Sequence, residues 1–273
     1  MSNGIEVLVS MSSKKLSVLV VTKHRPEFIP WWVWNIAKQT HQPYEVIVVD
    51  SSPRASEWTP NLIKHIEQHV APQRLEVLRA PSYYATGAAR DLALQHVTGD
   101  VITWNDDDDW FHPKKFEWLM NAVDDKHPIA MIGVDLRLLL RDEDGSFLEH
   151  PILFPYRESI GYPHIPYMAF DYEFTKSYPI PKDKLIGEDT DWTNAMILDQ
   201  GQEGWDRVKI IREHFPGMIL IHGENTYHDR RRFDFEIEMD GKPLPLKAPM
   251  DVEEEEWIET LRQLDGLKER LEE

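Results

Sequence analysis

Residues 16 to 125 of this 273-residue chain alternate between strand-like and helix-like segments, and this alternation limits the folds that the chain can adopt. Short β-branched runs are each followed by a longer stretch with apolar residues at helical spacing. We expect strands at Leu16 to Val21, Glu45 to Asp50, Leu75 to Arg79 and Asp100 to Asn105, and helices at Pro30 to Thr40, Asn61 to His69, Gly87 to His96 and Pro113 to Asp125. This order predicts an α/β fold with a mostly parallel, Rossmann-like sheet covered by helices on both faces.

The second half of the chain is less regular. We expect a strand at Ala130 to Arg141, a helix beginning near Asp189, and short strands at Val208 to Arg212 and Met218 to Ile221. The stretch from His150 to Pro181 is rich in proline and tyrosine, which predicts irregular structure that shapes an acceptor pocket. These patterns predict an N-terminal extension (1–15), a main domain (16–232) with halves at 16–125 and 126–232, and a C-terminal extension (233–273).

The C-terminal extension contains a predicted amphipathic helix from Val252 to Leu271. Its apolar residues recur at spacings of three and four and form one stripe: Trp257, Leu261, Leu264, Leu267 and Leu271. Two uses of this stripe stay open at this point. It packs on the chain's own domain, or it forms the contact of a homodimer.

Composition excludes several classes of protein. The chain contains no cysteine, which excludes disulfides and thiolate metal sites and fits a reducing compartment, so we expect a cytoplasmic protein. No apolar run approaches the ~20 residues of a membrane-spanning helix, and Met1 to Ser13 resembles no signal peptide. A net charge of −18 opposes nonspecific binding to nucleic acid or anionic lipid. Arg230-Arg231-Arg232 is a local exception, read as a solvated loop or as a phosphate or acceptor contact.

Four consecutive aspartates, Asp106 to Asp109, directly follow the fourth predicted strand. So many like charges are stable only beside a compensating cation, and carboxylate oxygens suit Mg²⁺ or Mn²⁺. In an α/β sheet, ligands bind at the carboxyl ends of the strands, where Asp50 also lies. A solvated loop is the alternative, but Trp110, Phe111 and Pro113 follow at once and pin the acids between a strand and a helix. A phosphorylated substrate is therefore expected.

Seven segments together carry a resemblance to a known family. They are Ser17 to Pro26, Gln39-Thr40 with Pro43, Glu45 to Ser52, Gly87 to Ala93, Asp106 to Pro113, Gly187 to Trp192 and Ile221 to Thr226. In order and spacing they resemble the family-two glycosyltransferases of the nucleotide-sugar-dependent, Asp-x-Asp type, over roughly residues 16 to 226. The resemblance implies a GT-A fold and transfer of a sugar from a nucleoside-diphosphate sugar to an acceptor hydroxyl, with inversion.

The resemblance also implies roles for individual residues. The nucleotide-sugar-binding residues would be Thr22, Arg25, Asp50, Arg90, Asp106 and Asp107. Among these, Asp50 would recognise the base, Arg90 would lie at the nucleotide or its phosphates, and Asp106 would contact the ribose. Asp108 would hold Mn²⁺ or Mg²⁺, with His222 completing the metal site and His228 close enough to substitute for it.

Glu188 and Asp189 resemble the Glu-Asp motif of the same enzymes. The resemblance implies that Asp189 is the general base for the acceptor hydroxyl, and Glu188 would orient acceptor or sugar hydroxyls. The alternative is that both are helix N-terminal acids stabilised by the helix dipole.

Two departures from the family pattern refine the expectation. The chain lacks the Gln-x-x-Arg-Trp motif and the membrane helices of processive synthases, which favours addition of a single sugar. Asn105 stands where the family usually has an apolar residue, and this either alters the ribose side of the site or has no effect.

Rival functions predict different features. A glycoside hydrolase needs two carboxylates but no run of four aspartates at a strand end. A nucleotidyltransferase should carry a glycine-rich basic loop after the first strand, and Thr22 to Pro26 contains no glycine. A noncatalytic sugar-nucleotide-binding module would bind donor and metal without turnover.

For the acceptor we expect a saccharide, a lipid-linked saccharide or another hydroxyl. A phage-type enzyme that glycosylates a hydroxymethylated base in DNA is the alternative, which the net charge disfavours.

Overall fold

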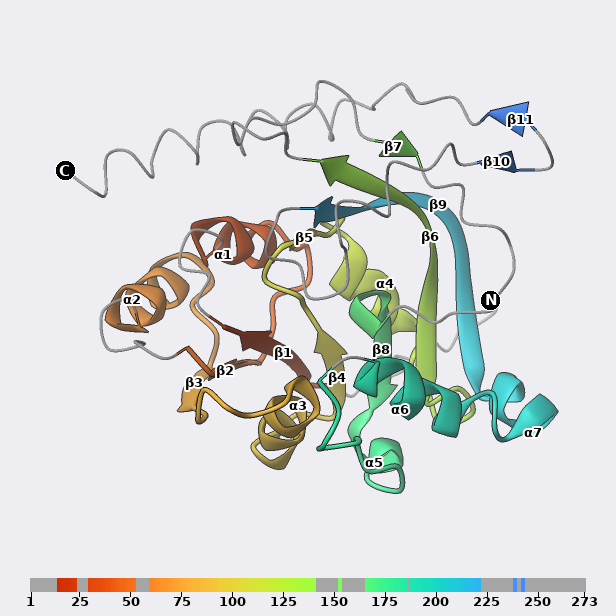
Figure 1. Cartoon of the computed structure of the whole chain (residues 1–273), viewed down its shortest axis with the longest axis horizontal. Helices are drawn as coiled ribbons and strands as arrows, with labels where there is room; N and C mark the ends of the chain where they lie inside the picture. Colours follow the sequence, from red (N-terminus) through yellow and green to blue (C-terminus); the bar gives the residue numbers. More distant parts are fainter. Residues whose placement is uncertain are drawn as a thin grey trace, which may run out of the picture.

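The computed structural model describes residues 14–23, 29–52, 59–140, 152–153, 165–185, 187–221, 238–239 and 242–243 (Figure 1). The strands are β1 (Leu16–Thr22), β2 (Glu45–Asp50), β3 (Arg74–Arg79), β4 (Val101–Trp104), β5 (Asp109–Trp110), β6 (Ile129–Leu140), β7 (Ile152–Leu153), β8 (Met168–Asp171), β9 (Val208–Ile221), β10 (Glu238–Met239) and β11 (Lys242–Pro243). The helices are α1 (Ile29–Ala37), α2 (Thr59–His69), α3 (Thr86–Gln95), α4 (Lys115–Ala122), the 3₁₀ helix η2 (Ile165–Tyr167), α5 (Tyr172–Thr175), α6 (Glu188–Met196) and α7 (Gly201–Asp206).

One nine-stranded sheet organises the fold. Its order is β3-β2-β1-β4-β8-β6-β9-β5, with β7 paired to β6. The strands β3, β2, β1 and β4 are parallel, and β8 is antiparallel to both β4 and β6. Consequently β6, and β9 parallel to it, run in the same direction as the first four strands. The expected α/β fold with a mostly parallel sheet is confirmed.

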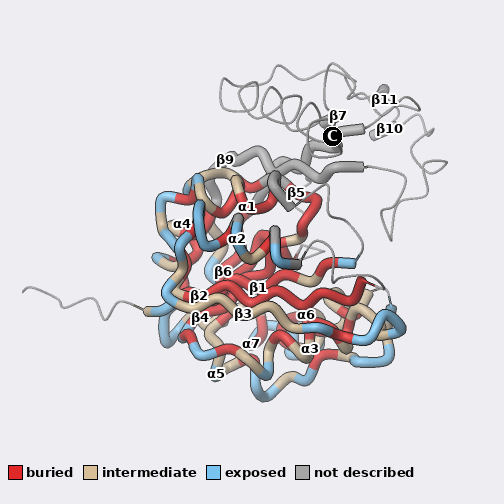
Figure 2. Tube along the Cα trace, turned by 90° about the vertical axis from the view of Figure 1, so that its left-hand side faces the viewer, coloured by how far each residue is buried: buried red, intermediate tan, exposed pale blue. Residues whose placement is uncertain are grey.

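Helices cover both faces of the sheet, and two hydrophobic clusters fill the space between them. Alternate strand residues serve opposite faces: Val18 and Val20 belong to the cluster under α1, α2 and α4, whereas Leu19 belongs to the cluster under α3 and α6. The core strands are almost fully buried, as the red tube in the middle of Figure 2 shows. Each fully buried Val, Leu or Ile side chain contributes about 1.5–3 kcal/mol. Hydrophobic burial on both faces therefore fixes the positions at which β1, β2 and β4 end.

Two expectations for the second half of the chain are wrong. The stretch from His150 to Pro181 does not lack regular structure, because β8 within it is buried in the centre of the sheet. A four-residue strand buried on both faces has no apolar–polar alternation by which it can be recognised. The two short strands expected at Val208 to Arg212 and Met218 to Ile221 are one strand, β9, which pairs with β6 along its length and contains Pro216. Proline is usually a sign that a strand is interrupted.

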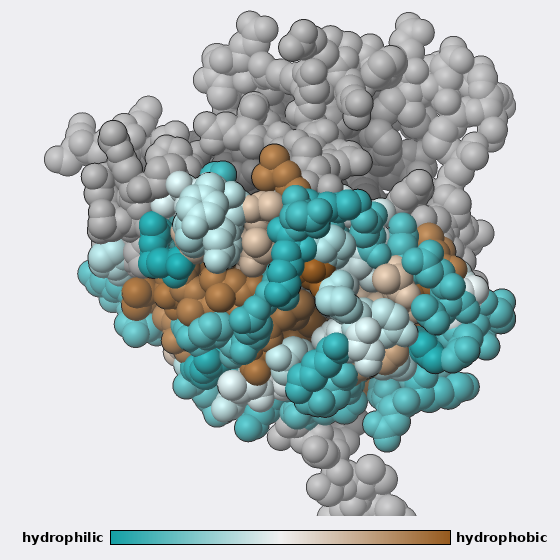
Figure 3. All heavy atoms as spheres, turned by 60° about the horizontal axis from the view of Figure 1, so that its bottom comes forward, coloured by the Kyte–Doolittle hydropathy of each residue, from teal (hydrophilic) through white to brown (hydrophobic). Residues whose placement is uncertain are grey.

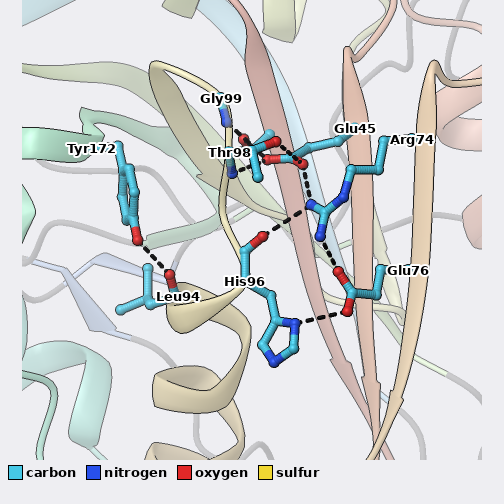
Figure 4. A network of polar contacts seen from close by, with 9 residues as sticks. Glu45, Arg74, Glu76, Leu94, His96, Thr98, Gly99 and Tyr172 are labelled. Carbon is cyan, nitrogen blue, oxygen red and sulfur yellow. Dashed lines mark hydrogen bonds and ion pairs between the residues drawn. The ribbon is translucent and has the colours of Figure 1, made fainter.

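A buried carboxylate ties the starts of three strands together at the edge opposite the aspartate run (Figure 4). The Glu45 side chain accepts hydrogen bonds from Ser17 Oγ (2.6 Å), Thr98 N (2.7 Å), Thr98 Oγ1 (2.7 Å) and Gly99 N (2.9 Å), and it pairs with Arg74. Burial opposes ionisation of Glu45, but these donors outweigh it and hold its pKa below the usual value. The network fixes β1, β2 and the loop before β4 relative to one another.

The surface gives two further facts. Within the described ranges, no helix combines the length and apolarity needed to cross a bilayer. On the face toward the bottom of Figure 1, hydrophobic residues form a band between rims of hydrophilic ones (Figure 3).

Candidate active site

The aspartate run lies between β4 and α4, at the edge where β1 and β2 also end, and its last member, Asp109, begins β5. The strand register aligns Thr22 with Asp50, and Ser51 N donates to Thr22 O at 3.0 Å. The Thr22 hydroxyl donates to Asp107 Oδ2 at 2.5 Å, and both side chains are buried. The first strand and the aspartate loop are therefore joined directly at this edge.

Asp50 lies at the end of β2 with its carboxylate fully buried. Asp50 Oδ1 accepts from Ser52 N at 2.8 Å, and Oδ2 pairs with Arg79, whose Nη2 also donates to Ser52 O at 2.9 Å. Arg79 ends β3 and was not among the residues predicted from the sequence. Sequence reasoning missed it, because the register of β2 and β3, which sets Arg79 opposite Asp50, comes from strand pairing and not from the pattern of either strand.

Arg90 on α3 connects the aspartate loop to α6. Its Nε donates to Glu188 Oε1 at 3.0 Å, its Nη2 lies 3.4 Å from Asp106 Oδ1, and its guanidinium lies over the Trp104 ring, 4.7 Å from the centroid. Burial acts to lower the pKa of Arg90, but Asp106, Asp189 and Glu188 together raise it above its usual value. Arg90 is thus a permanent positive charge among three carboxylates.

Glu188 and Asp189 are the first two residues of α6, which begins after Gly187 in a left-handed conformation (φ 76°). A residue with a Cβ rarely adopts this conformation, so glycine sets the direction in which the helix starts. Trp192 anchors the helix, because it is buried, packs on Phe170 and donates from Nε1 to Tyr178 O at 2.6 Å. Burial raises the pKa of Glu188, Arg90 opposes this rise, and Asp189 adds to it.

The segment before α6 is held against the start of α3. Gly87 N donates to Lys184 O at 3.1 Å, and Thr86 Oγ1 donates to Leu185 O at 3.0 Å. A Cβ on Gly87 would lie 1.9 Å from Pro181 O, which no side chain could accommodate without moving the backbone. Glycine at this position therefore permits the close approach that brings α6 beside Arg90.

A lysine is buried behind the aspartate loop. Lys115 Nζ donates to Trp104 O at 3.1 Å and to Asn105 Oδ1, and it lies 3.7 Å from the centroid of the Phe111 ring. Burial lowers the pKa of Lys115 well below its usual value, although Asp106 and Asp109 oppose this. Sequence reasoning missed Lys115, because a lysine in the first turn of an amphipathic helix usually faces solvent. The departure at Asn105 has a structural role: it accepts a hydrogen bond from this lysine.

Asp109, the last aspartate of the run, is a buried carboxyl group that borders the site. Burial raises its pKa well above the usual value, and Asp108 and Asp106 raise it further. Burial likewise raises the pKa of Tyr167, with Asp109 and Asp106 adding to the effect. The inner end of the aspartate run therefore disfavours additional negative charge, whereas Asp106, with a side chain 33% exposed, faces outward.

The donor set fits a metal held mainly by its substrate. Among the described residues, no three carboxylates or histidines gather closely enough to form a metal site on their own. Mg²⁺, however, is usually bound by one or two carboxylates together with substrate phosphates. Asp108, 7% exposed at the same edge of the sheet, is a suitable ligand of this kind.

The structure brings most of the predicted site residues together at this edge. They are Thr22, Asp50, Arg90, Asp106, Asp107, Asp108, Glu188 and Asp189. Arg25, His222, His228 and the run Arg230-Arg231-Arg232 lie outside the described residues, as does the helix expected at Val252 to Leu271. Their roles, and the domain boundaries, stay predictions.

Comparison with known proteins agrees with this arrangement. The family model for glycosyl transferase family 2 matches residues 17–175, more than half of the chain. An uncharacterized glycosyltransferase from Haemophilus influenzae is 23% identical over 141 residues, which cover 50% of this chain and 44% of that protein. YwdF from Bacillus subtilis, also an uncharacterized glycosyltransferase, is 28% identical over 110 residues, which cover 40% of this chain and 38% of that protein. The matched regions thus span less than half the length of either relative.

Solved structures show the same fold at low sequence identity. S. aureus TarS 1-349, solved in complex with UDP-GlcNAc, gives a TM-score of 0.57 at 17% identity over 77% of this chain and 60% of that one. The mannosyltransferase PcManGT from Pyrobaculum calidifontis, solved with GDP-Man and Mn²⁺, gives a TM-score of 0.53 at 17% identity. The match covers 77% of this chain and 58% of that one. Both carry the GT-A fold that the sequence led us to expect. With its fold and its family model in agreement, the chain belongs to glycosyltransferase family 2.

Proposed function

We propose that this protein transfers one sugar from a nucleoside-diphosphate sugar to an acceptor hydroxyl, with inversion, in a reaction that requires Mn²⁺ or Mg²⁺. One observation carries the proposal. Arg90 joins Asp106 of the aspartate loop to Glu188 at the start of α6, so the expected donor side and the expected base lie at one edge of the sheet.

The donor side of the proposal uses the ends of the first four strands. Asp50 recognises the base, Thr22 and Asp107 hold the loop beside the nucleotide, and Asp106 contacts the ribose. Arg79 and Ser52 N hold the buried Asp50 carboxylate in place at the end of β2. Asp108 is the proposed metal ligand, and His222 or His228 is a candidate second ligand. The metal, when bound, neutralises the charge that develops on the departing diphosphate.

The acceptor side uses the start of α6. Asp189 accepts the proton of the attacking hydroxyl, and its position on the first turn of a helix anchored by Trp192 restricts its movement. Inversion follows when the hydroxyl attacks the anomeric carbon on the face opposite the leaving diphosphate. A base placed in this way contributes on the order of 10²- to 10⁴-fold to the rate.

Neighbouring structures suggest which donors to examine first. TarS was solved with UDP-GlcNAc and PcManGT with GDP-Man and Mn²⁺, so both sugar nucleotides are reasonable donors for this chain. For the acceptor we propose a saccharide or lipid-linked saccharide in glycan synthesis, in the cytoplasm. Modification of a hydroxymethylated base in DNA is disfavoured by the net charge of −18. A homodimer through the C-terminal helix is a further proposal.

The experiment that tests this function is a screen of nucleotide sugars for metal-dependent release of free nucleotide. UDP-GlcNAc, UDP-glucose and GDP-mannose are each incubated with the full chain, with Mn²⁺, Mg²⁺ or EDTA, and with or without saccharide acceptors. We expect release from at least one donor that is abolished by EDTA and increased by an acceptor. Donor binding without release in every combination would instead identify a noncatalytic binding module.

Asp189→Asn separates the base from the donor site. The amide keeps the shape of the carboxylate but removes its basicity, so we expect donor affinity within about threefold of wild type and a rate lower by about 10²- to 10⁴-fold. Calorimetry with donor and Mn²⁺ measures the first quantity, and nucleotide release measures the second. A variant with near-wild-type turnover would transfer the role of base to Glu188 or Asp191.

A further inference from the structure

Arg90 is held on two sides by protein carboxylates, and this limits what its guanidinium can do. Its side chain is only 8% exposed and lies against the Trp104 ring. Nε is used by Glu188 at 3.0 Å and Nη2 by Asp106 at 3.4 Å. An arginine that grips a diphosphate normally presents its planar fork to the ligand. Here Nε and Nη2, which form one edge of that fork, both face protein carboxylates.

The two contacts reach opposite halves of the proposed reaction. Asp106 belongs to the loop that carries the proposed metal ligand, whereas Glu188 directly precedes the proposed base Asp189. The Glu188 contact is the shorter and more buried of the two, since the Glu188 side chain is 5% exposed and that of Asp106 is 33% exposed. Arg90 Nη1 is buried without a hydrogen-bond partner among the described residues, so the guanidinium retains one nitrogen that can still donate.

We propose that Arg90 is a positioning residue: it fixes Glu188, and with it the start of α6 and Asp189, relative to the aspartate loop. This inference rests on the proposed function and replaces the role at the phosphates that the family resemblance implied. Donor binding at the loop is thereby coupled to the placement of the base. Loss of the guanidinium fork lowers the rate of transfer and leaves the affinity for the donor nearly unchanged.

The matched control lies one residue further along α3. Asp91 also links α3 to the segment before α6, because its Oδ2 forms an ion pair with Lys182 Nζ at 2.8 Å, and the side chain of Lys182 is 60% exposed. Asp91→Asn therefore removes a bridge between the same two segments without touching the aspartate loop. Surface pairs of this kind contribute about 0–1 kcal/mol, and we expect turnover of this variant within about twofold of wild type.

The test uses the full chain as wild type, Arg90→Lys, Glu188→Gln and the double variant, with UDP-GlcNAc or GDP-mannose and Mn²⁺ as probes. A lysine at position 90 cannot bridge two carboxylates in one plane. We therefore expect kcat of Arg90→Lys to fall by about 10- to 100-fold, while its Kd for the donor changes by less than about threefold. In the Glu188→Gln background, Arg90→Lys should lower kcat by less than about threefold, because the two residues act as a unit. A donor Kd raised more than about tenfold at unchanged kcat, or fully additive losses, would overturn the inference in favour of a phosphate contact.

A second readout does not depend on turnover or on the stability of one variant. The carboxyl resonance of Glu188 is followed by NMR in wild type, Arg90→Gln and Asp91→Asn. Since Arg90 opposes the rise in the pKa of Glu188, Arg90→Gln should raise that pKa further and Asp91→Asn should leave it unchanged. An unaltered Glu188 pKa in Arg90→Gln would refute the coupling. Absence of nucleotide release by the wild type would instead refute the proposed function.

Discussion

Replacing Glu45 with glutamine is expected to destabilise the protein by about 3–5 kcal/mol at pH 7. The Glu45 carboxylate receives only donors, namely two backbone N–H groups, two hydroxyls and the Arg74 guanidinium. A glutamine NH₂ group would face donors on whichever side it is placed. About two charge-assisted hydrogen bonds, each contributing roughly 1.5–3 kcal/mol, would therefore be lost.

The effect of this substitution should depend on pH. The folded-state pKa of Glu45 is lowered, so its contribution to stability is fully present above the unfolded-state pKa of about 4.3 and is lost as the pH falls through the folded-state value. The difference in stability between wild type and Glu45→Gln should accordingly be constant between pH 5 and pH 7 and should shrink toward pH 3.

Urea unfolding followed by tryptophan fluorescence at pH 7, 5, 4 and 3 measures these differences. Glu76→Gln is the matched control, since Glu76 also pairs with Arg74 but its side chain is 27% exposed. This substitution should lower the free energy of unfolding by less than about 1 kcal/mol. Glu45 lies at the edge of the sheet opposite the candidate site, so kcat per folded molecule should not change. A Glu45→Gln difference below about 1 kcal/mol at pH 7, or one that persists undiminished at pH 3, would refute this reasoning.

Three further predictions concern the candidate site. Asp108→Asn should abolish Mn²⁺-dependent donor binding in calorimetry, because a neutral amide cannot replace the carboxylate's charge at a hard cation, and unchanged donor affinity would refute the assignment. Asp50→Ala should weaken binding of free UDP or GDP by roughly 1.5–3 kcal/mol without altering the metal dependence, and equal nucleotide affinity would give Asp50 another role. Asn105→Leu should destabilise the fold by about 1–3 kcal/mol in urea, because Lys115 Nζ loses a hydrogen bond in the interior. The same substitution should cost less in a Lys115→Met background, and a strictly additive double variant would refute this pairing.

The fold of residues 16 to 125, apart from the two-residue strand β5, could be predicted because the other strands and helices there each carry their own sequence pattern. The strand Glu45–Asp50 agrees with the expectation to the residue. The buried strand β8 could not be predicted, because it is short, apolar until its last residue and begins two residues after Pro166, so local pattern does not distinguish it from a loop. Its position depends on pairing with β4 and β6, which are far from it in the sequence.

The candidate site shows the same division. Residues at strand ends, such as Asp50 and Asp106, could be predicted to lie at one edge because parallel strands all end there. Partners that come from other elements could not, since the pairing of Arg79 with Asp50 and of Arg90 with Glu188 depends on tertiary packing. A lysine that turns inward, as Lys115 does, has no local signature at all.

The antiparallel strand β8 has a consequence for the synthesis of the chain. One edge of β4 pairs with β1, and the other pairs with β8, where Thr103 Oγ1 also donates to Met168 O at 2.8 Å. At about 5–20 residues per second, the ribosome takes several seconds to extend the chain from Trp104 to Met168. During that interval the outer edge of β4 lacks the strand that will cover it, and uncovered strand edges template intermolecular pairing. Fragments truncated before Met168 should therefore aggregate, whereas extension through Ile221, which also supplies β9 for the other edge of β6, should restore solubility.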